Sequence, residues 1–159
     1  MPLFVGTYEN KVDKKGRVSV PARFRAALSG ESFNGIVAYP AFDGIQAIEA
    51  SGIGWLEQLS GRLNSLNPFS PGHRTLATAI FGRSLQLPFD DEGRVILPQE
   101  FLNHAGITER ATFVALGRTF LIWDPKTYEA FAREVGEQAA RESVRLDPSF
   151  GRDPTEGGR

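Results

Sequence analysis

Cysteine is absent from this 159-residue chain, and several classes of site are excluded with it. Disulfide scaffolds, thiolate metal centres and thiol nucleophiles all require cysteine. The two histidines, His73 and His104, have no second ligand at helical or hairpin spacing, so we expect surface or interface positions for them. No phosphate-cradling glycine loop and no nucleophile with a base at a recognisable spacing is present. The sequence therefore predicts a protein that is not an enzyme and uses no cofactor or metal.

Long apolar runs and a secretion signal are also lacking. No apolar run approaches the roughly 20 residues that a transmembrane helix needs. The opening residues 1–8 meet Glu9, Lys11 and Asp13 almost at once, unlike the basic-then-apolar pattern of a signal peptide. We expect a cytoplasmic protein with no membrane partner and no small-molecule substrate.

Positive charge is scarce overall but concentrated in one segment. The formal net charge of the chain is -1. Between residues 11 and 25, six basic residues face one acid, Asp13, which gives +5 there and leaves -6 for the remainder. Such a run is usually a solvated surface, so it needs a second observation before it indicates a partner. The six basic residues are Lys11, Lys14, Lys15, Arg17, Arg23 and Arg25.

An internal repeat supplies that observation. The segment 13–24, DKKGRVSVPARF, recurs without a gap as 90–101, DDEGRVILPQEF, 77 residues further on. Each copy predicts a strand, a turn at Asp-x-x-Gly, a returning strand rich in β-branched residues and a short helix at the proline. Further on, 45–49 resembles 120–124, and each is followed by a helical pattern. Two copies of one structural unit are therefore expected.

The repeat predicts the domain organisation and the main elements. We expect strands at 7–12, 33–39 and 45–48 in the first copy and at 84–89, 111–116 and 119–123 in the second. Ser51 and Asp124 are the expected N-caps of the helices that follow, and Ser70-Pro71 is expected to start a linking helix. The chain then divides into a first repeat (1–66), a linking helix (67–82), a second repeat (83–146) and a tail (147–159) whose composition predicts disorder.

The two copies differ sharply in charge. The second window, 88–102, sums to -3, because Arg94 stands against Asp90, Asp91, Glu92 and Glu100. Lys14 and Lys15 of the first turn correspond to Asp91 and Glu92, and Arg23 corresponds to Glu100. An acid in the first turn of a helix is favoured by about 0.3–1 kcal/mol, a gain that the first copy forgoes. A surface that binds phosphate explains this difference, since Lys, Arg and helix N-terminal N–H groups all attract anions.

The paired Asp-x-x-x-Arg motifs, Asp13/Arg17 and Asp90/Arg94, followed by VSVP and VILP, resemble the MraZ family, the double-domain relatives of the AbrB/SpoVT transition-state regulators. The opening FVGTYE, the run PARFR and the segment FLIWD at 120–124 also fit that family. The resemblance covers roughly residues 1–135. It departs at Ile53-Gly54-Trp55, where the family has a more charged helix start, and in the tail after Leu146.

The resemblance implies an α+β, β-rich fold: a tandem duplicated AbrB-like swapped-hairpin β-barrel with short helices and a C-terminal helix, whose subunits close into a homo-oligomeric ring. It also implies sequence-specific binding to short direct repeats in the promoter of the division and cell-wall gene cluster, usually with repression. A nucleoid-associated location would follow. By position, the DNA-facing side chains of the first repeat would be Lys14, Lys15, Arg17, Arg23 and Arg25.

The individual side chains carry competing interpretations. We favour a phosphate or guanine contact for Arg17 over an ion pair with Asp13 alone, because its surroundings are basic. Arg94, set among acids, is expected to stabilise its turn or a subunit interface. Asp13 and Asp90 are expected to accept hydrogen bonds within their own turns. Arg25, two residues beyond Arg23, has the alternative of facing another side of the helix.

A second functional class stays open at this point. The chain could be an oligomeric scaffold whose basic face binds an acidic protein partner. Such a scaffold would show no preference among DNA sequences, which separates it from a regulator.

Overall fold

The computed structural model describes residues 2–145, and within them an antiparallel six-stranded sheet and a two-stranded ribbon form the β structure. The tail predicted at 147–159 lies outside the described residues. In chain order the elements are β1 (Thr7–Lys11), β2 (Arg17–Ser19), α1 (Ala22–Ala27), β3 (Gly35–Pro40), β4 (Ile48–Ser51), α2 (Ile53–Leu63), α3 (Pro71–Ala77), the π-helical turn η1 (Thr78–Gly82), β5 (Leu85–Pro88), β6 (Arg94–Ile96), α4 (Gln99–Ala105), β7 (Arg110–Ala115), β8 (Phe120–Trp123) and α5 (Pro125–Arg145).

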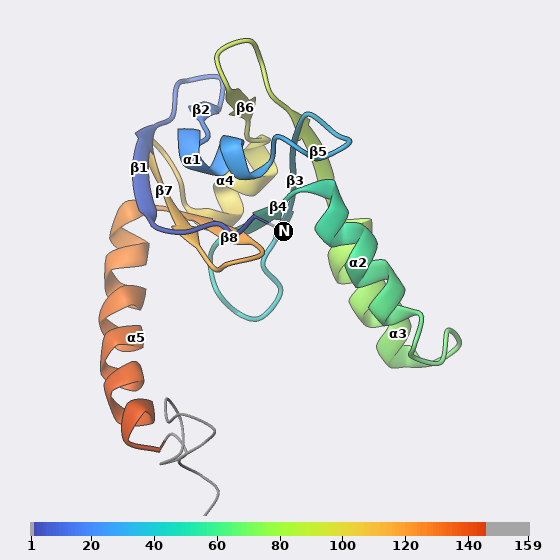
Figure 1. The fold of residues 1–159 in the computed structure, drawn as a ribbon. Helices are drawn as coiled ribbons and strands as arrows, with labels where there is room; N and C mark the ends of the chain where they lie inside the picture. Colours follow the sequence, from blue (N-terminus) through green and yellow to red (C-terminus); the bar gives the residue numbers. More distant parts are fainter. Residues whose placement is uncertain (1, 146–159) are drawn as a thin grey trace, which may run out of the picture. The chain divides into compact units, whose positions relative to one another are not determined.

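Both β structures contain pairs in which a strand of one repeat lies beside a strand of the other. The sheet order is β1-β7-β8-β4-β3-β5, and the ribbon is β2-β6. β1 of the first repeat pairs with β7 of the second, β5 of the second pairs with β3 of the first, and β4 pairs with β8. The order is symmetric about the β8–β4 pair (Figure 1). The interleaving of two duplicated halves is therefore present in one chain.

The α+β class, the short helices and the C-terminal helix are confirmed, but the expected closed barrel is wrong. Within the described residues the sheet is open, with β1 and β5 as its edges. The chain leaves these edge strands at the turns that follow them and pairs β2 with β6 in a separate ribbon (Figure 1). No strand therefore pairs with both β1 and β5, as closure of the described sheet would require. Pro88 at the end of β5 also lacks the N–H that a further strand would need.

The ribbon is anchored by the same core as the sheet. Its inward residues, Val18 and Val95, are each 1% exposed and belong to the main apolar cluster. Phe24 on α1 and Phe101 on α4, which correspond in the repeat, are buried in that cluster as well. Phe24 also packs against the aromatic rings of Phe4, Tyr8, Phe113 and Phe120. This packing fixes the ribbon and the turns at its ends relative to α1 and α4.

The segment after β3 departs from the sequence prediction. The strand expected at 45–48 lies at Ile48–Ser51, because its register with β8 pairs Ile48 with Ile122 and because Gly44 lies in a turn with a φ of 89°. Ser51 is not the N-cap of α2. It is the buried last residue of β4, its hydroxyl donates to the Gly52 carbonyl, and Gly52 is the N-cap.

The other two caps are confirmed. Ser70 Oγ accepts a hydrogen bond from the backbone N–H of His73, and α3 begins at Pro71. The helical part of the expected linker therefore starts at residue 71 and runs through η1 to Gly82. Asp124 Oδ2 accepts from the backbone N–H of Thr127 at the start of α5.

The part of α5 from Tyr128 onward is a compact unit by itself. Its second half carries mostly charged and polar side chains, and Gln138 Nε2 donates to Glu142 Oε1 one helical turn away. Across residues 2–145, each helix is either too short or too polar to span a bilayer.

Candidate nucleic-acid interface

The turn between β1 and β2 is organised by Asp13. Its Oδ1 accepts hydrogen bonds from the backbone N–H groups of Lys15 and Arg17, each at 2.9 Å. The N–H of Gly16 donates to the Asp13 carbonyl at 3.0 Å, and Gly16 has a φ of 85°, which favours glycine. The turn therefore presents Lys14 and Lys15 at its tip on a fixed backbone, and both are exposed.

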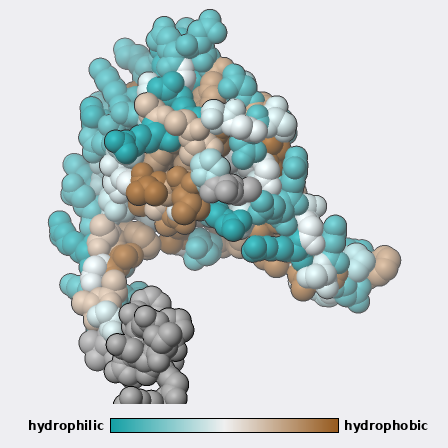
Figure 2. All heavy atoms as spheres, viewed as in Figure 1, coloured by the Kyte–Doolittle hydropathy of each residue, from teal (hydrophilic) through white to brown (hydrophobic). Residues whose placement is uncertain are grey.

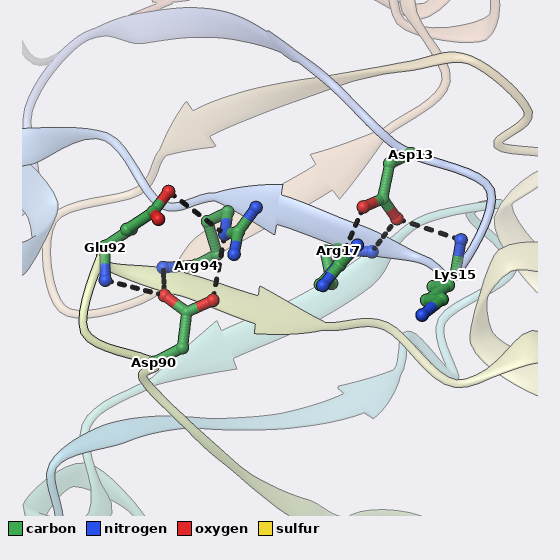
Figure 3. Close-up of polar contacts among 6 residues, drawn as sticks. All are labelled: Asp13, Lys15, Arg17, Asp90, Glu92 and Arg94. Carbon is green, nitrogen blue, oxygen red and sulfur yellow. Dashed lines mark hydrogen bonds and ion pairs between the residues drawn. The ribbon is translucent and has the colours of Figure 1, made fainter.

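Arg17 is held by the same aspartate. Its Nε lies 2.7 Å from Asp13 Oδ2, and the two side chains are 35% and 37% exposed (Figure 3). The backbone N–H of Arg17, followed by its side chain, holds the pKa of Asp13 below its usual value, so the carboxylate stays charged. Within residues 2–145, neither Nη atom of Arg17 donates a hydrogen bond. The ion pair between Arg17 and Asp13, which was the alternative to DNA contact, is therefore present. It uses only Nε, so the two Nη atoms of the guanidinium can still donate to a phosphate or a guanine.

The turn between β5 and β6 repeats this geometry. Asp90 Oδ1 accepts from the N–H groups of Glu92 and Arg94, each at 2.9 Å, and Arg94 Nε lies 2.8 Å from Asp90 Oδ2 (Figure 3). Backbone and side-chain hydrogen bonds from Arg94 lower the pKa of Asp90, while the hydrogen bond to Asp90 raises the pKa of Arg94. Glu92 adds a second carboxylate 3.8 Å from Arg94 Nε. Arg94 is therefore surrounded by more negative charge than Arg17.

Both arginines lie on the outer face of the β2–β6 ribbon. Arg17 is directly opposite Ile96, and Ser19 is opposite Arg94, while the alternate residues Val18 and Val95 point into the core. A two-stranded ribbon is one of the elements that fit the DNA major groove, which is about 12 Å wide. The two turns lie at opposite ends of this antiparallel ribbon, so its basic end is separate from its acidic end (Figure 3).

The other cations of the first repeat are less uniform in placement. Arg23 is exposed on α1 and lines a surface hollow together with Asn10 and Ser19. Arg25 is half-buried, and its Nε donates to the Val20 carbonyl at 3.1 Å. Figure 2 shows a mainly hydrophilic surface over the end of the molecule where Figure 1 places β2 and β6. The structure thus brings Lys14, Lys15 and Arg17 together on one turn and directs Arg25 elsewhere.

One basic residue beside the turn is missed by reasoning from the sequence. Arg110 of β7 lies across from Lys11 in the β1–β7 register and forms an ion pair with Glu9. With Lys11 and Lys14 it lines a hollow of about 470 Å³ next to the first turn. No local pattern could have indicated this, since only the pairing of strands from different repeats brings Arg110 to Lys11.

A metal centre does not assemble in the part of the chain that the structure describes. Over that range, no group of three or more histidine and acidic side chains is arranged to hold a metal ion. His104 is half-buried on α4, and its Nε2 is buried without a hydrogen-bond partner.

Comparison with known proteins gives a consistent result. The family model of the MraZ protein matches residues 3–39 and 80–146, which contain both Asp-x-x-x-Arg turns. A protein of Rickettsia akari named transcriptional regulator MraZ is 49% identical over 146 residues, covering 92% of this chain and 97% of its own length. Proteins of the same name are 45% identical in Rickettsia canadensis, with the same coverage, and 43% identical in Pelagibacter ubique, over 93% of this chain and 96% of that protein.

Proposed function

Because the chain belongs to the MraZ family, we propose that it is a DNA-binding transcriptional regulator, without enzymatic activity, whose first turn and ribbon contact promoter DNA. The names of its relatives support the regulatory role, and the basic turn supports DNA as the partner.

One observation carries the proposal: two turns with the same backbone hydrogen bonds have tips of opposite charge. Asp13 and Asp90 accept the same set of N–H donors at the same distances. The fold therefore does not require Lys14 and Lys15, since Asp91 and Glu92 occupy the equivalent places in the second turn. Clustered exposed cations are the main source of affinity for the phosphate backbone.

Each residue of the basic end has a distinct part in this proposal. Lys14 and Lys15 position the turn on phosphates and carry no sequence information. Arg17, oriented by Asp13 through Nε, donates from its Nη atoms to a guanine edge or a phosphate. Outside the basic end, Arg23 of α1, which lines a hollow with Ser19 at the other end of β2, adds a phosphate contact.

We infer that subunits assemble into a ring and grip successive short direct repeats together. Linking several weak sites in this way raises avidity by roughly 10²–10⁴ without new contacts. The regulated promoter would be that of the division and cell-wall gene cluster, with repression as the outcome and a cytoplasmic, nucleoid-associated location.

The test is binding to DNA from upstream of the protein's own gene, compared with scrambled DNA of equal length at physiological salt. We expect protection of regularly spaced short repeats, loss of specific binding in Arg17→Ala, and retained intrinsic DNA contact in the matched variant Arg94→Ala. Sedimentation would report assembly in both, and we expect Arg94→Ala to weaken it. Equal affinity for promoter and scrambled DNA would reject the proposal and favour the scaffold for an acidic protein partner.

A further inference from the structure

Each hairpin turn is covered by a side chain from the other repeat, and the two covering side chains differ in charge. A Cβ built on Gly16 of the first turn would lie 3.6 Å from Leu102 Cδ1 of α4. A Cβ built on Gly93 of the second turn would lie 2.6 Å from Arg25 Nη1 of α1. Arg25 and Leu102 occupy equivalent places, 77 residues apart. The apolar side chain covers the basic turn, and the cationic one covers the acidic turn.

The Arg25 guanidinium therefore lies at the acidic end of the ribbon. Its guanidinium lies against the backbone of Gly93, and together with Asp90 and Asp91 it lines a hollow of about 330 Å³. Its Nε donates to the Val20 carbonyl at 3.1 Å. Arg23, two residues earlier on the same helix, is exposed and lines a different hollow, which also includes part of Arg25.

The contacts of Arg25 connect three elements. The N–H of Val20, the residue after β2, donates to the Gly93 carbonyl at 3.2 Å, and the Val20 carbonyl accepts from Arg25. The residue that follows the ribbon strand is thus bonded to the second turn through its N–H and to α1 through its carbonyl. Moving Arg25 would release the second turn from α1 and loosen the end of β2, the strand that begins with Arg17.

We propose that Arg25 is a positioning residue: it fixes the acidic turn, and through Val20 the ribbon, and it makes no contact with DNA. This inference deepens the proposed function and rests on it. A cation at this place balances the acids of the second turn, whereas Leu102 adds no charge to the first turn. The set of residues that contact DNA is then Lys14, Lys15, Arg17 and Arg23.

The experiment compares Arg25→Leu with Arg23→Leu in the full-length protein, since each removes one charge from α1. Leucine is the residue at the equivalent place, Leu102, so the duplicated fold accommodates a side chain of that size there. The readout is the slope of log affinity for the promoter fragment against log salt, which falls by about 0.9 for each phosphate that the protein no longer neutralises. We expect that decrease in Arg23→Leu, and an unchanged slope with several-fold weaker affinity in Arg25→Leu.

Arg25→Lys separates charge from geometry. It keeps the charge but cannot reproduce the Nε bond to Val20, so we expect it to resemble Arg25→Leu. Amide hydrogen exchange at Val20 should be faster in both Arg25 variants and unchanged in Arg23→Leu. A slope reduced by Arg25→Leu and restored by Arg25→Lys, or Val20 exchange that is unaffected, would overturn the positioning role. Absence of promoter binding by the parent protein would instead reject the proposed function, while the exchange measurement would still test whether Arg25 stabilises the hydrogen bond from the Val20 N–H to the Gly93 carbonyl.

Discussion

Replacing the tip of the first turn with that of the second should remove a defined part of the DNA affinity. The variant Lys14→Asp/Lys15→Glu changes the charge of the tip from +2 to −2 and gives it residues of the types that Asp91 and Glu92 supply in the second turn. Both turns have the same backbone hydrogen bonds, so the new residues suit the local fold. We therefore expect the change to affect binding and leave the free energy of unfolding almost unaltered.

The magnitude follows from the number of phosphates that the tip neutralises. If both lysines neutralise phosphates, the salt slope should fall by about 1.8, at 0.9 for each lysine. Near 1 M salt the electrostatic contribution is small, so the variant and the parent protein should bind almost equally there. At a tenfold lower salt concentration, near 0.1 M, the variant should bind about 60-fold more weakly than the parent, which is about 1.8 powers of ten. That factor corresponds to about 2.5 kcal/mol of binding free energy. Repulsion between the new acids and DNA would add to this loss.

The assay is a fluorescence-anisotropy titration of a promoter fragment at several salt concentrations. The matched control is Asp91→Asn/Glu92→Gln, which alters the tip of the second turn by the same number of residues and should leave the slope unchanged. A slope that stays the same in Lys14→Asp/Lys15→Glu would show that the basic tip does not contact phosphates. The variant lowers the net charge by four and the control raises it by two. A slope that rises in the control by half as much as it falls in the variant would therefore show that net charge alone, and not the place of the lysines, determines affinity.

Three further predictions concern the stability and titration of the folded chain. Phe24→Leu should destabilise the fold by about 1–3 kcal/mol more than Phe101→Leu in urea unfolding, because only Phe24 packs against four other aromatic rings. Gly16→Ala should lower the free energy of unfolding more than Gly44→Ala. Both glycines have positive φ, which costs an alanine about 1–2 kcal/mol. A Cβ on Gly16 would in addition lie 2.6 Å from a backbone carbonyl oxygen, whereas a Cβ on Gly44 would meet nothing within 4 Å. Burial, followed by the charge of Glu49, raises the pKa of Tyr39, so absorbance titration should show one of the three tyrosines still protonated well above pH 10, about the ordinary tyrosine pKa. The associated stability is fully present below pH 10 or so and is lost as pH rises through the raised pKa, and Tyr39→Phe should remove this late step.

The sequence was sufficient to predict the turns because their determinants are local. An aspartate that accepts N–H groups two and four residues ahead, and a glycine at positive φ, specify the turn within five residues. Comparing the two copies then exposed the charge difference between Lys14 and Asp91 without any structure. The duplicated fold followed from the repeat and from the family resemblance together.

The predictions that failed concern features that depend on contacts between residues far apart in the sequence. The shift of β4 to Ile48–Ser51 depends on its register with β8, whose residues lie about 70 positions away. An apolar pattern shows that a strand exists but does not fix which of its residues pair. The closed barrel failed for a similar reason, since closure depends on which strand reaches each edge and not on the strands themselves.

Arg25 shows why counting charges along a sequence overestimates the number of cations that are available to bind DNA. Six basic residues between 11 and 25 contribute equally to the +5 total, but the structure places them in different electrostatic surroundings. Lys14 and Lys15 are exposed at the tip of the first turn, and Asp13 and Glu109 line the same hollow as Lys14. Arg25 instead lies against the turn that holds Asp90 and Asp91. In a duplicated fold whose copies interleave, a cation from one repeat can neutralise the other. The affinity for DNA should therefore follow the exposed cations at the first turn, and a variant that lowers total charge at Arg25 should leave the salt slope where it was.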